Sequence, residues 1–149
     1  MKQTALITGG SKRIGRAIAE FLAENGWNLI IHYNSSNKPA QELAKELKRK
    51  FPNQKFQPVQ ANLSNIEEVK RLIPQVIDET GRFQLLINNA SVFDSGYILE
   101  TAAELFDSQV NVNLRAPFFL TRDFAKHCKS GNIINFVDTR VTMNKSNFA

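Results

Sequence analysis

Short apolar runs alternate along this chain with longer segments of helical periodicity, and this alternation constrains the fold most. The apolar runs predict strands over residues 4–8, 28–33, 55–60, 84–88 and 132–137. Apolar residues at helical spacing predict helices over about 14–24, 39–50, 64–79 and 101–129. Strands that are apolar throughout are typical of a parallel sheet covered on both faces. The sequence therefore predicts an α/β protein with a doubly wound, Rossmann-type parallel sheet, in one domain spanning residues 1–149.

Two of the predicted helices begin with the spacing of a capping box. Ser64 is followed by Glu67, and Thr101 is followed by Glu104. In a capping box the hydroxyl accepts a hydrogen bond from the first helical turn, and the carboxylate three residues later reaches back. We therefore expect Ser64 and Thr101 to cap these helices.

Composition and charge exclude several classes of protein. The chain is 42% hydrophobic, and its single cysteine, Cys128, excludes an internal disulfide framework. No apolar run approaches the roughly 18 residues of a transmembrane helix, and the first residues lack the apolar core of a signal peptide. The net charge of +5 includes cations at 45–50, but interspersed glutamates favour a solvated helix face. We expect a cytoplasmic protein with no membrane, nucleic-acid or metal partner.

The first strand is joined to the first helix by TGGSKRIG, residues 8–15. A pyrophosphate at a helix N-terminus needs such a turn, because the backbone must bend tightly and bring free N–H groups close to the phosphate. Gly9 or Gly10 permits the bend, and Gly15 lets the helix pack closely on the strand. Lys12 and Arg13 add two cations. The turn predicts a dinucleotide site, and the alternative is a glycine turn without a ligand.

The end of the second strand bears on which dinucleotide is bound. NAD-binding folds place an acid about 20 residues after the turn to bind the ribose hydroxyls. This chain instead has Asn34, Ser35 and Ser36. A carboxylate would repel a 2′-phosphate, whereas hydroxyls, an amide and nearby Lys12 would accept one. The sequence therefore favours NADPH over NADH, unless these three residues merely form a turn.

Three motifs in this setting resemble the short-chain dehydrogenase/reductase family over essentially the whole length. TGGSKRIG resembles the family turn Thr-Gly-x-x-x-Gly-x-Gly, Asn88-Asn89-Ala90 resembles Asn-Asn-Ala-Gly, and Asn113 stands at the place of the active-site asparagine. The resemblance implies the N-terminal five-strand portion of a short-chain reductase fold. The cofactor-binding residues it implies are Gly9, Ser11, Lys12, Arg13, Ile14, Gly15, Asn34, Ser35, Ser36, Asn62, Leu63, Asn89, Ala90 and Ser91.

Four departures from the general pattern resemble the pteridine reductase branch, which includes the bacterial dihydromonapterin reductases. Arg13 replaces the central glycine of the turn, Ser91 replaces the last glycine of Asn-Asn-Ala-Gly, and Phe93 follows. Asp138 stands where most of the family has a catalytic serine. This resemblance implies NADPH-dependent reduction of a pterin or dihydropterin. Phe93 would stack on the ring, Arg13 and Ser91 would bind the pterin or the cofactor phosphates, and Asp138, with Asn113, would serve catalysis.

Each of these residues also has an ordinary structural interpretation. Phe93 is one of 11 phenylalanines and suits a core, Asp138 could cap a turn, and Asn113 could stabilise a local helix kink. Asn62 replaces an aspartate that contacts the adenine in the family, and its amide can still bind the amine. Ser35 replaces an arginine that often binds the 2′-phosphate, which weakens the preference for NADPH.

The family's proton donor is absent from the sequence. The family uses a tyrosine with a lysine four residues later, but the only tyrosines here, Tyr33 and Tyr97, lack that lysine. Residues 139–149 show no pattern. One interpretation is a C-terminally incomplete segment of a longer reductase, and the other is a naturally short module. In both cases we expect these 149 residues alone not to turn over substrate.

The leading hypothesis is thus an NADPH-dependent pteridine reductase, represented here by its cofactor-binding part. The alternatives are a 3-oxoacyl-carrier-protein reductase or another carbonyl reductase of the family, against which Ser91, Phe93 and Asp138 argue, and a catalytically inactive nucleotide-binding module. The resemblance also implies a homotetramer in the complete form.

Overall fold

Each predicted strand and helix is present in the computed structural model, which describes residues 3–138. In chain order the elements are β1 (Thr4–Ile7), α1 (Arg13–Glu24), β2 (Asn28–Tyr33), α2 (Asn37–Lys50), β3 (Phe56–Gln60), α3 (Ile66–Thr80), β4 (Leu85–Asn88), α4 (Ala103–Val110), η1 (Asn111–Arg115), α5 (Ala116–Cys128) and β5 (Asn132–Asn135). The tail at residues 139–149, for which the sequence shows no pattern, lies outside the described residues.

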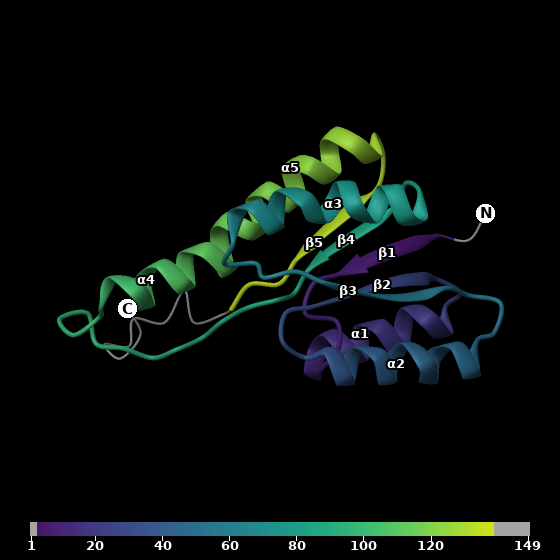
Figure 1. Cartoon of the computed structure of the whole chain (residues 1–149), viewed down its shortest axis with the longest axis horizontal. Coiled ribbons are helices and arrows are strands. Elements are labelled where there is room, and N and C mark those ends of the chain that lie inside the picture. Colours follow the sequence, from purple (N-terminus) through teal and green to yellow (C-terminus); the bar gives the residue numbers. More distant parts are fainter. Residues whose placement is uncertain (1–2, 139–149) are drawn as a thin grey trace.

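The five strands form one parallel sheet in the order β3-β2-β1-β4-β5. Alternate residues of β1 face opposite sides: Leu6 packs with α3 and α5, whereas Ala5 and Ile7 pack with α1 and α2. Figure 1 shows these two helix layers on either side of the sheet. Because both faces are buried, the strands are apolar without alternation. The predicted fold class, a doubly wound α/β sheet, is confirmed.

The sheet grows in two directions from β1. The chain adds β2 and β3 on one side of β1 and then crosses over to place β4 and β5 on the other side. The carboxyl ends of parallel strands all lie along one edge of the sheet. Ligands of open α/β sheets bind at that edge, next to the point where the strand order reverses. The reversal here lies between β1 and β4, so the topology favours a site at their carboxyl ends.

The helix caps differ from the sequence prediction. The N-cap of α3 is Asn65, not Ser64: its Oδ1 accepts from the N–H of Glu67, and its Nδ2 donates to Glu68. The Ser64 hydroxyl donates to Asn62 instead. The N-cap therefore lies one residue later than predicted, because an asparagine side chain caps as well as serine does, and Glu68 accepts from the N–H of Asn62 and not from that of Asn65. Thr101 is no cap either, since its hydroxyl donates to the carbonyl of Tyr97.

The helix predicted over 101–129 is interrupted. α4 passes into the π-helical turn η1 and then into α5, so the helix is widened by one extra residue within Asn111–Arg115, the segment that contains Asn113. Such π turns occur frequently at functional sites. The periodicity of apolar residues could not reveal it, because a single inserted residue hardly changes the pattern over a long helix.

Apolar side chains are exposed on two surfaces of the C-terminal half. Ile134, Phe136 and Val137 are exposed on and after β5, and Phe106 and Phe118 are exposed on α4 and α5. Figure 1 shows α4 extending beyond the sheet. Within residues 3–138, no helix has both the length and the apolar character needed to cross a membrane.

Candidate functional site

The turn between β1 and α1 has two positions at which a side chain would be strained or would overlap the backbone. Gly9 has φ +63°, and a Cβ there would lie 3.1 Å from the Cα of Ala90. A Cβ on Gly15 would lie 2.1 Å from the carbonyl oxygen of Gly9, which is a severe overlap. The predicted roles of these glycines, a tight bend and close helix–strand packing, fit this geometry.

The N-terminus of α1 offers unpaired donors. Within the described part of the chain, the backbone N–H groups of residues 11–15 have no acceptor, and the first helical bond runs from Arg16 N–H to Lys12 C=O. The first turn of α1 holds no acidic residue. Free N–H groups and the positive end of a helix dipole bind phosphate oxygens. The residues present therefore fit a pyrophosphate, with Ser11 buried in the turn and Ile14 exposed beside it.

We call the turn and helix N-terminus at residues 8–15 the phosphate cradle. Within it, Lys12 and Arg13 are exposed. Among the described residues neither forms an ion pair. Arg13 has φ +49°, in the left-handed region that costs a side-chain-bearing residue about 1–2 kcal/mol. Arg13 thus has a backbone conformation that suits glycine, the residue expected at this place in the family turn. Retained strain of this kind is typical of functional positions.

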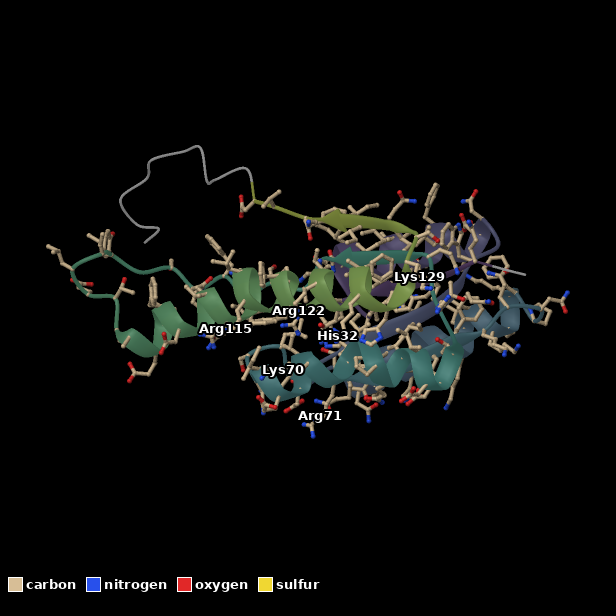
Figure 2. The ribbon with its side chains drawn as sticks, turned by 90° about the horizontal axis from the view of Figure 1, so that it is seen from above. His32, Lys70, Arg71, Arg115, Arg122 and Lys129 are labelled. Carbon is tan, nitrogen blue, oxygen red and sulfur yellow. The ribbon has the colours of Figure 1, made fainter. Side chains whose placement is uncertain are left out.

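His32 on β2 was not singled out from the sequence, yet it contacts the cradle directly. Its side chain is 1% exposed, its Nδ1 accepts from the N–H of Gly9 (3.1 Å), and its Nε2 lies 3.0 Å from the carbonyl oxygen of Ala61. Burial lowers the pKa of His32 to about 4, so the ring is neutral at physiological pH. Figure 2 labels this side chain. A histidine within the otherwise apolar run NLIIHY was the available signal.

The predicted 2′-phosphate residues lie directly after β2. Asn34 and Ser35 are exposed, and Ser36 is the N-cap residue of α2 but makes no side-chain capping bond. The hydroxyl of Ser36 is therefore not used to cap the helix. The three residues lie at the carboxyl end of the strand next to β1, on the same edge as the glycine turn.

After β3, Asn62 has a different hydrogen-bonding capacity from the one expected. Its Oδ1 already accepts from the N–H and the hydroxyl of Ser64, so the amide oxygen is occupied. An adenine amine needs an acceptor, whereas the remaining Nδ2 is a donor, which suits a ring nitrogen of the base. Leu63 is buried in the core beneath this loop.

After β4, Asn89 joins the end of that strand to the glycine turn. Its Nδ2 donates to the carbonyl oxygens of Thr8 (2.9 Å) and Gly9 (3.2 Å). The Thr8 hydroxyl accepts from the N–H groups of Asn89 and Ala90. The side chain of Asn89 thus supports the cradle, while Ser91, two residues on, is exposed.

The loop beyond Ser91 is held by two amides from α4 and η1. Asn113 accepts from the Val92 N–H (3.0 Å) and donates to the Val92 carbonyl (2.8 Å). The Gln109 amide accepts from the Nδ2 of Asn113 (2.9 Å) and lies against the Val92 carbonyl and the Asp94 N–H. Phe93, between these anchors, is 52% exposed and lies outside the core. Sequence reasoning missed Gln109, although its place one turn before Asn113 was visible.

Asp138 follows β5, whose pairing with β4 continues as far as the bond from Phe136 N–H to the Asn88 carbonyl. It is exposed and comes three residues after the last residue of the strand. The predicted residues therefore all follow carboxyl ends of strands or lie on the π turn. No group of three potential metal ligands occurs within residues 3–138.

Comparison with known proteins matches this geometry to a family. The family model for short chain dehydrogenase matches residues 3–146. The 3-oxoacyl-[acyl-carrier-protein] reductase FabG of Staphylococcus aureus is 32% identical over 138 residues, which are 91% of this chain and 55% of that protein. The short-chain dehydrogenase/reductase FrzI of a Cladobotryum species is 33% identical over 127 residues, which are 85% and 48%. This chain spans about half the length of these curated relatives.

Solved structures give the same result. FolM alternative dihydrofolate reductase 1 of Brucella suis, in complex with NADP, superposes with a TM-score of 0.90 at 32% identity and covers 98% of this chain, which is 61% of that chain. A blue fluorescent protein from a metagenomic library, in complex with NADPH, gives a TM-score of 0.88 at 28% identity over 97% of this chain and 59% of its own. From motif, topology and relatives together, this chain belongs to the short-chain dehydrogenase/reductase family.

Proposed function

We propose that this chain carries the cofactor site of an NADPH-dependent reductase that acts on a pterin or dihydropterin. The observation that supports it most is the set of N–H groups at residues 11–15, which have no acceptor within residues 3–138, next to two cations that form no ion pair there and with no carboxylate in the first turn of α1. Structural neighbours with 32% and 28% identity were solved with NADP and NADPH.

The preference for NADPH rests on the loop after β2. Asn34, Ser35 and Ser36 present amide and hydroxyl groups, and Lys12 supplies a cation. These groups bind a 2′-phosphate dianion, whereas the acid usual in NAD-binding folds would repel it. The N–H groups of residues 11–15 would bind the pyrophosphate.

The pterin substrate is supported by the exposed loop after β4. Phe93 presents an aromatic ring outside the core, as a flat heterocycle requires, and Arg13 and Ser91 offer donors for its polar edge. The neighbour from Brucella suis is an alternative dihydrofolate reductase, whose name also indicates a reduced pterin ring as substrate.

NADPH, when bound, supplies a hydride. The chain's own residues must then orient the substrate and deliver a proton. Asn113 holds the Val92 backbone beside Phe93, and Asp138 is the acid that follows β5. The family's Tyr-x-x-x-Lys motif does not occur in the sequence, so we propose that the 149-residue chain binds cofactor and substrate without turnover.

Ligand binding to the NADPH-saturated chain tests this proposal. We expect 7,8-dihydrobiopterin to bind more tightly than acetoacetyl-coenzyme A. Replacement Phe93→Ala should weaken pterin binding about tenfold, because a stacked aromatic ring contributes about 1.5 kcal/mol and its buried area adds to this. Phe21→Ala, which removes an exposed phenylalanine from α1, is the matched control and should have no effect.

A 3-oxoacyl-carrier-protein reductase is the second candidate, because FabG proteins are 32–33% identical to this chain. It predicts the reverse preference, for the 3-oxoacyl thioester, and no effect of Phe93→Ala. Equal and weak binding of both substrates would instead support an inactive nucleotide-binding module.

The exposed face of α4, η1 and α5 suits a second copy of this chain. Phe106, Leu114 and Phe118 are 61%, 67% and 64% exposed. Exposed apolar patches of this kind mark association surfaces. Sedimentation should detect an oligomer that dissociates when Phe118 is replaced by Asp.

A further inference from the structure

We propose that His32 is a positioning residue that couples the two ends of the dinucleotide site, by fixing the glycine turn and the loop after β3 through one imidazole ring. This inference rests on the proposed NADPH site and assigns a role to a residue that does not touch the cofactor.

The position of His32 in the sheet makes the coupling possible. β2 lies between β1 and β3, so a side chain at its carboxyl end reaches both neighbouring strand ends. The ring bonds Gly9 at 3.1 Å and Ala61 at 3.0 Å, residues that are 52 positions apart in the chain. Gly9 begins the phosphate cradle, and Ala61 directly precedes Asn62 on the adenine side.

The two hydrogen-bond partners allow the imidazole only one tautomer. The Gly9 N–H can only donate, so Nδ1 must be unprotonated, and the Ala61 carbonyl can only accept, so Nε2 must carry the proton. The ring is 1% exposed, so water does not compete for either bond. A buried donor and acceptor that are both satisfied rigidify their surroundings.

The backbone of β2 strengthens the same connection. The N–H of Gly10 donates to the carbonyl of His32 at 3.0 Å, and the N–H of Ala61 donates to the carbonyl of Tyr33 at 3.1 Å. The side-chain hydrogen bonds of His32 therefore add to backbone hydrogen bonds that already join the same three segments. Removing the ring should loosen Gly9 and Ala61 while leaving the sheet paired.

Two conservative variants separate the two ends. The Oδ1 of asparagine reaches the position of histidine Nδ1, so His32→Asn keeps the acceptor for Gly9 and loses the bond to Ala61. The Nε2 of glutamine reaches the position of histidine Nε2, so His32→Gln keeps the donor for Ala61 and loses the bond to Gly9. His32→Leu removes both bonds, and His127→Gln on α5 is the matched control.

The experiment measures, by calorimetry, the binding of two ligands to the full 149-residue chain. One is NADPH, and the other is the analogue of NADPH in which hypoxanthine replaces adenine. Adenine N1 accepts a hydrogen bond, whereas hypoxanthine N1 donates one, so the ratio of the two dissociation constants reports on Asn62. One hydrogen bond corresponds to about a fivefold preference of the wild-type chain for NADPH. The hypoxanthine analogue lacks the hydrogen bond from Asn62 to the base, so its affinity reports on the phosphate cradle alone.

We expect His32→Asn to lose the base preference but keep affinity for the hypoxanthine analogue. His32→Gln should keep the preference but bind both ligands about fivefold more weakly. His32→Leu should show both losses, and His127→Gln neither. Thermal unfolding monitored by circular dichroism confirms that each variant is folded, and the Asn and Gln variants suffice if the Leu variant is not.

Different failures have different meanings. No binding of NADPH by the wild-type chain would overturn the proposed function together with this inference. Binding by the wild-type chain with equal losses in the Asn and Gln variants, or with no losses, would overturn the coupling by His32 alone.

Discussion

The β1–β2–β3 half and the β4–β5 half of the sheet differ in how their strand ends are held. In the first half His32, which is 1% exposed, ties the end of β2 to those of β1 and β3, while Thr8, also 1% exposed, bonds across to the end of β4. In the second half Phe136 and Val137 are 49% and 81% exposed, and the buried Oδ1 of Asn88 has no partner within the described residues.

This difference indicates a division of labour. The backbone of a rigid phosphate cradle loses its conformational entropy during folding, so a common cofactor can bind there without rearrangement. The loop around Phe93 contacts the amides of Gln109 and Asn113 at a half-exposed surface. Loops on a rigid scaffold are where specificity changes between related proteins.

The largest expected effect is that of Gly15→Ala in the cradle. The new Cβ would lie 2.1 Å from the carbonyl oxygen of Gly9, so the turn must move. We expect the free energy of unfolding to fall by about 3 kcal/mol and NADPH binding to be lost. Gly81→Ala is the control: its φ is +78°, but nothing lies within 4 Å, so it should lose stability and retain binding. Normal NADPH binding by Gly15→Ala would contradict the rigid-cradle account.

The next effect is the pH dependence that His32 confers on the first half. Its pKa is about 4 when folded and about 6.5 when unfolded, so the unfolded chain binds the proton more tightly. The contribution is complete above pH 6.5 and is lost as the pH falls toward 4. It amounts to roughly 3 kcal/mol. Urea unfolding at pH 7.5 and pH 5 should detect about 2 kcal/mol of it, because pH 5 lies between the two pKa values. A wild-type pH slope equal to that of His32→Asn would refute this assignment.

A smaller effect is expected in the second half from Gln109→Leu, which keeps the size of the side chain and removes its amide. The Val92 carbonyl and the Asp94 N–H are at the surface, so water replaces the amide, and we expect a loss of about 1 kcal/mol. Hydrogen exchange at residues 92–94 should accelerate, while the affinity for NADPH should stay within about twofold. A large loss of NADPH affinity would show that the two halves are not independent.

The smallest effect is expected for Arg13→Gly at the boundary of the two halves. Glycine relieves the strain at φ +49° but adds disorder to the unfolded chain, so stability should rise by no more than about 1 kcal/mol. NADPH binding should weaken a few-fold through the lost cation. Calorimetric unfolding and titration measure both quantities, and tighter binding by the glycine variant would argue against a role of Arg13 in the site.

The features predicted from sequence are those with a local cause. Apolar runs such as LLIN and the glycines at 9 and 15 need only their own sequence to be interpreted. The features that were missed depend on distant partners. The contact of His32 with Gly9 and Ala61, and that of Gln109 with Val92, are set by which strands the topology makes neighbours. The shifted cap at Asn65 was missed because two adjacent residues could each begin the same helix.

Titration of the wild-type chain with NADPH and with NADH, under identical salt conditions, tests the central claim most directly. The N–H groups of residues 11–15, Lys12 and the loop at Asn34–Ser36 predict saturable binding of NADPH at least about tenfold tighter than that of NADH, from one to two charge-assisted contacts with the 2′-phosphate. Equal affinity for the two cofactors, or binding of neither, would contradict the account.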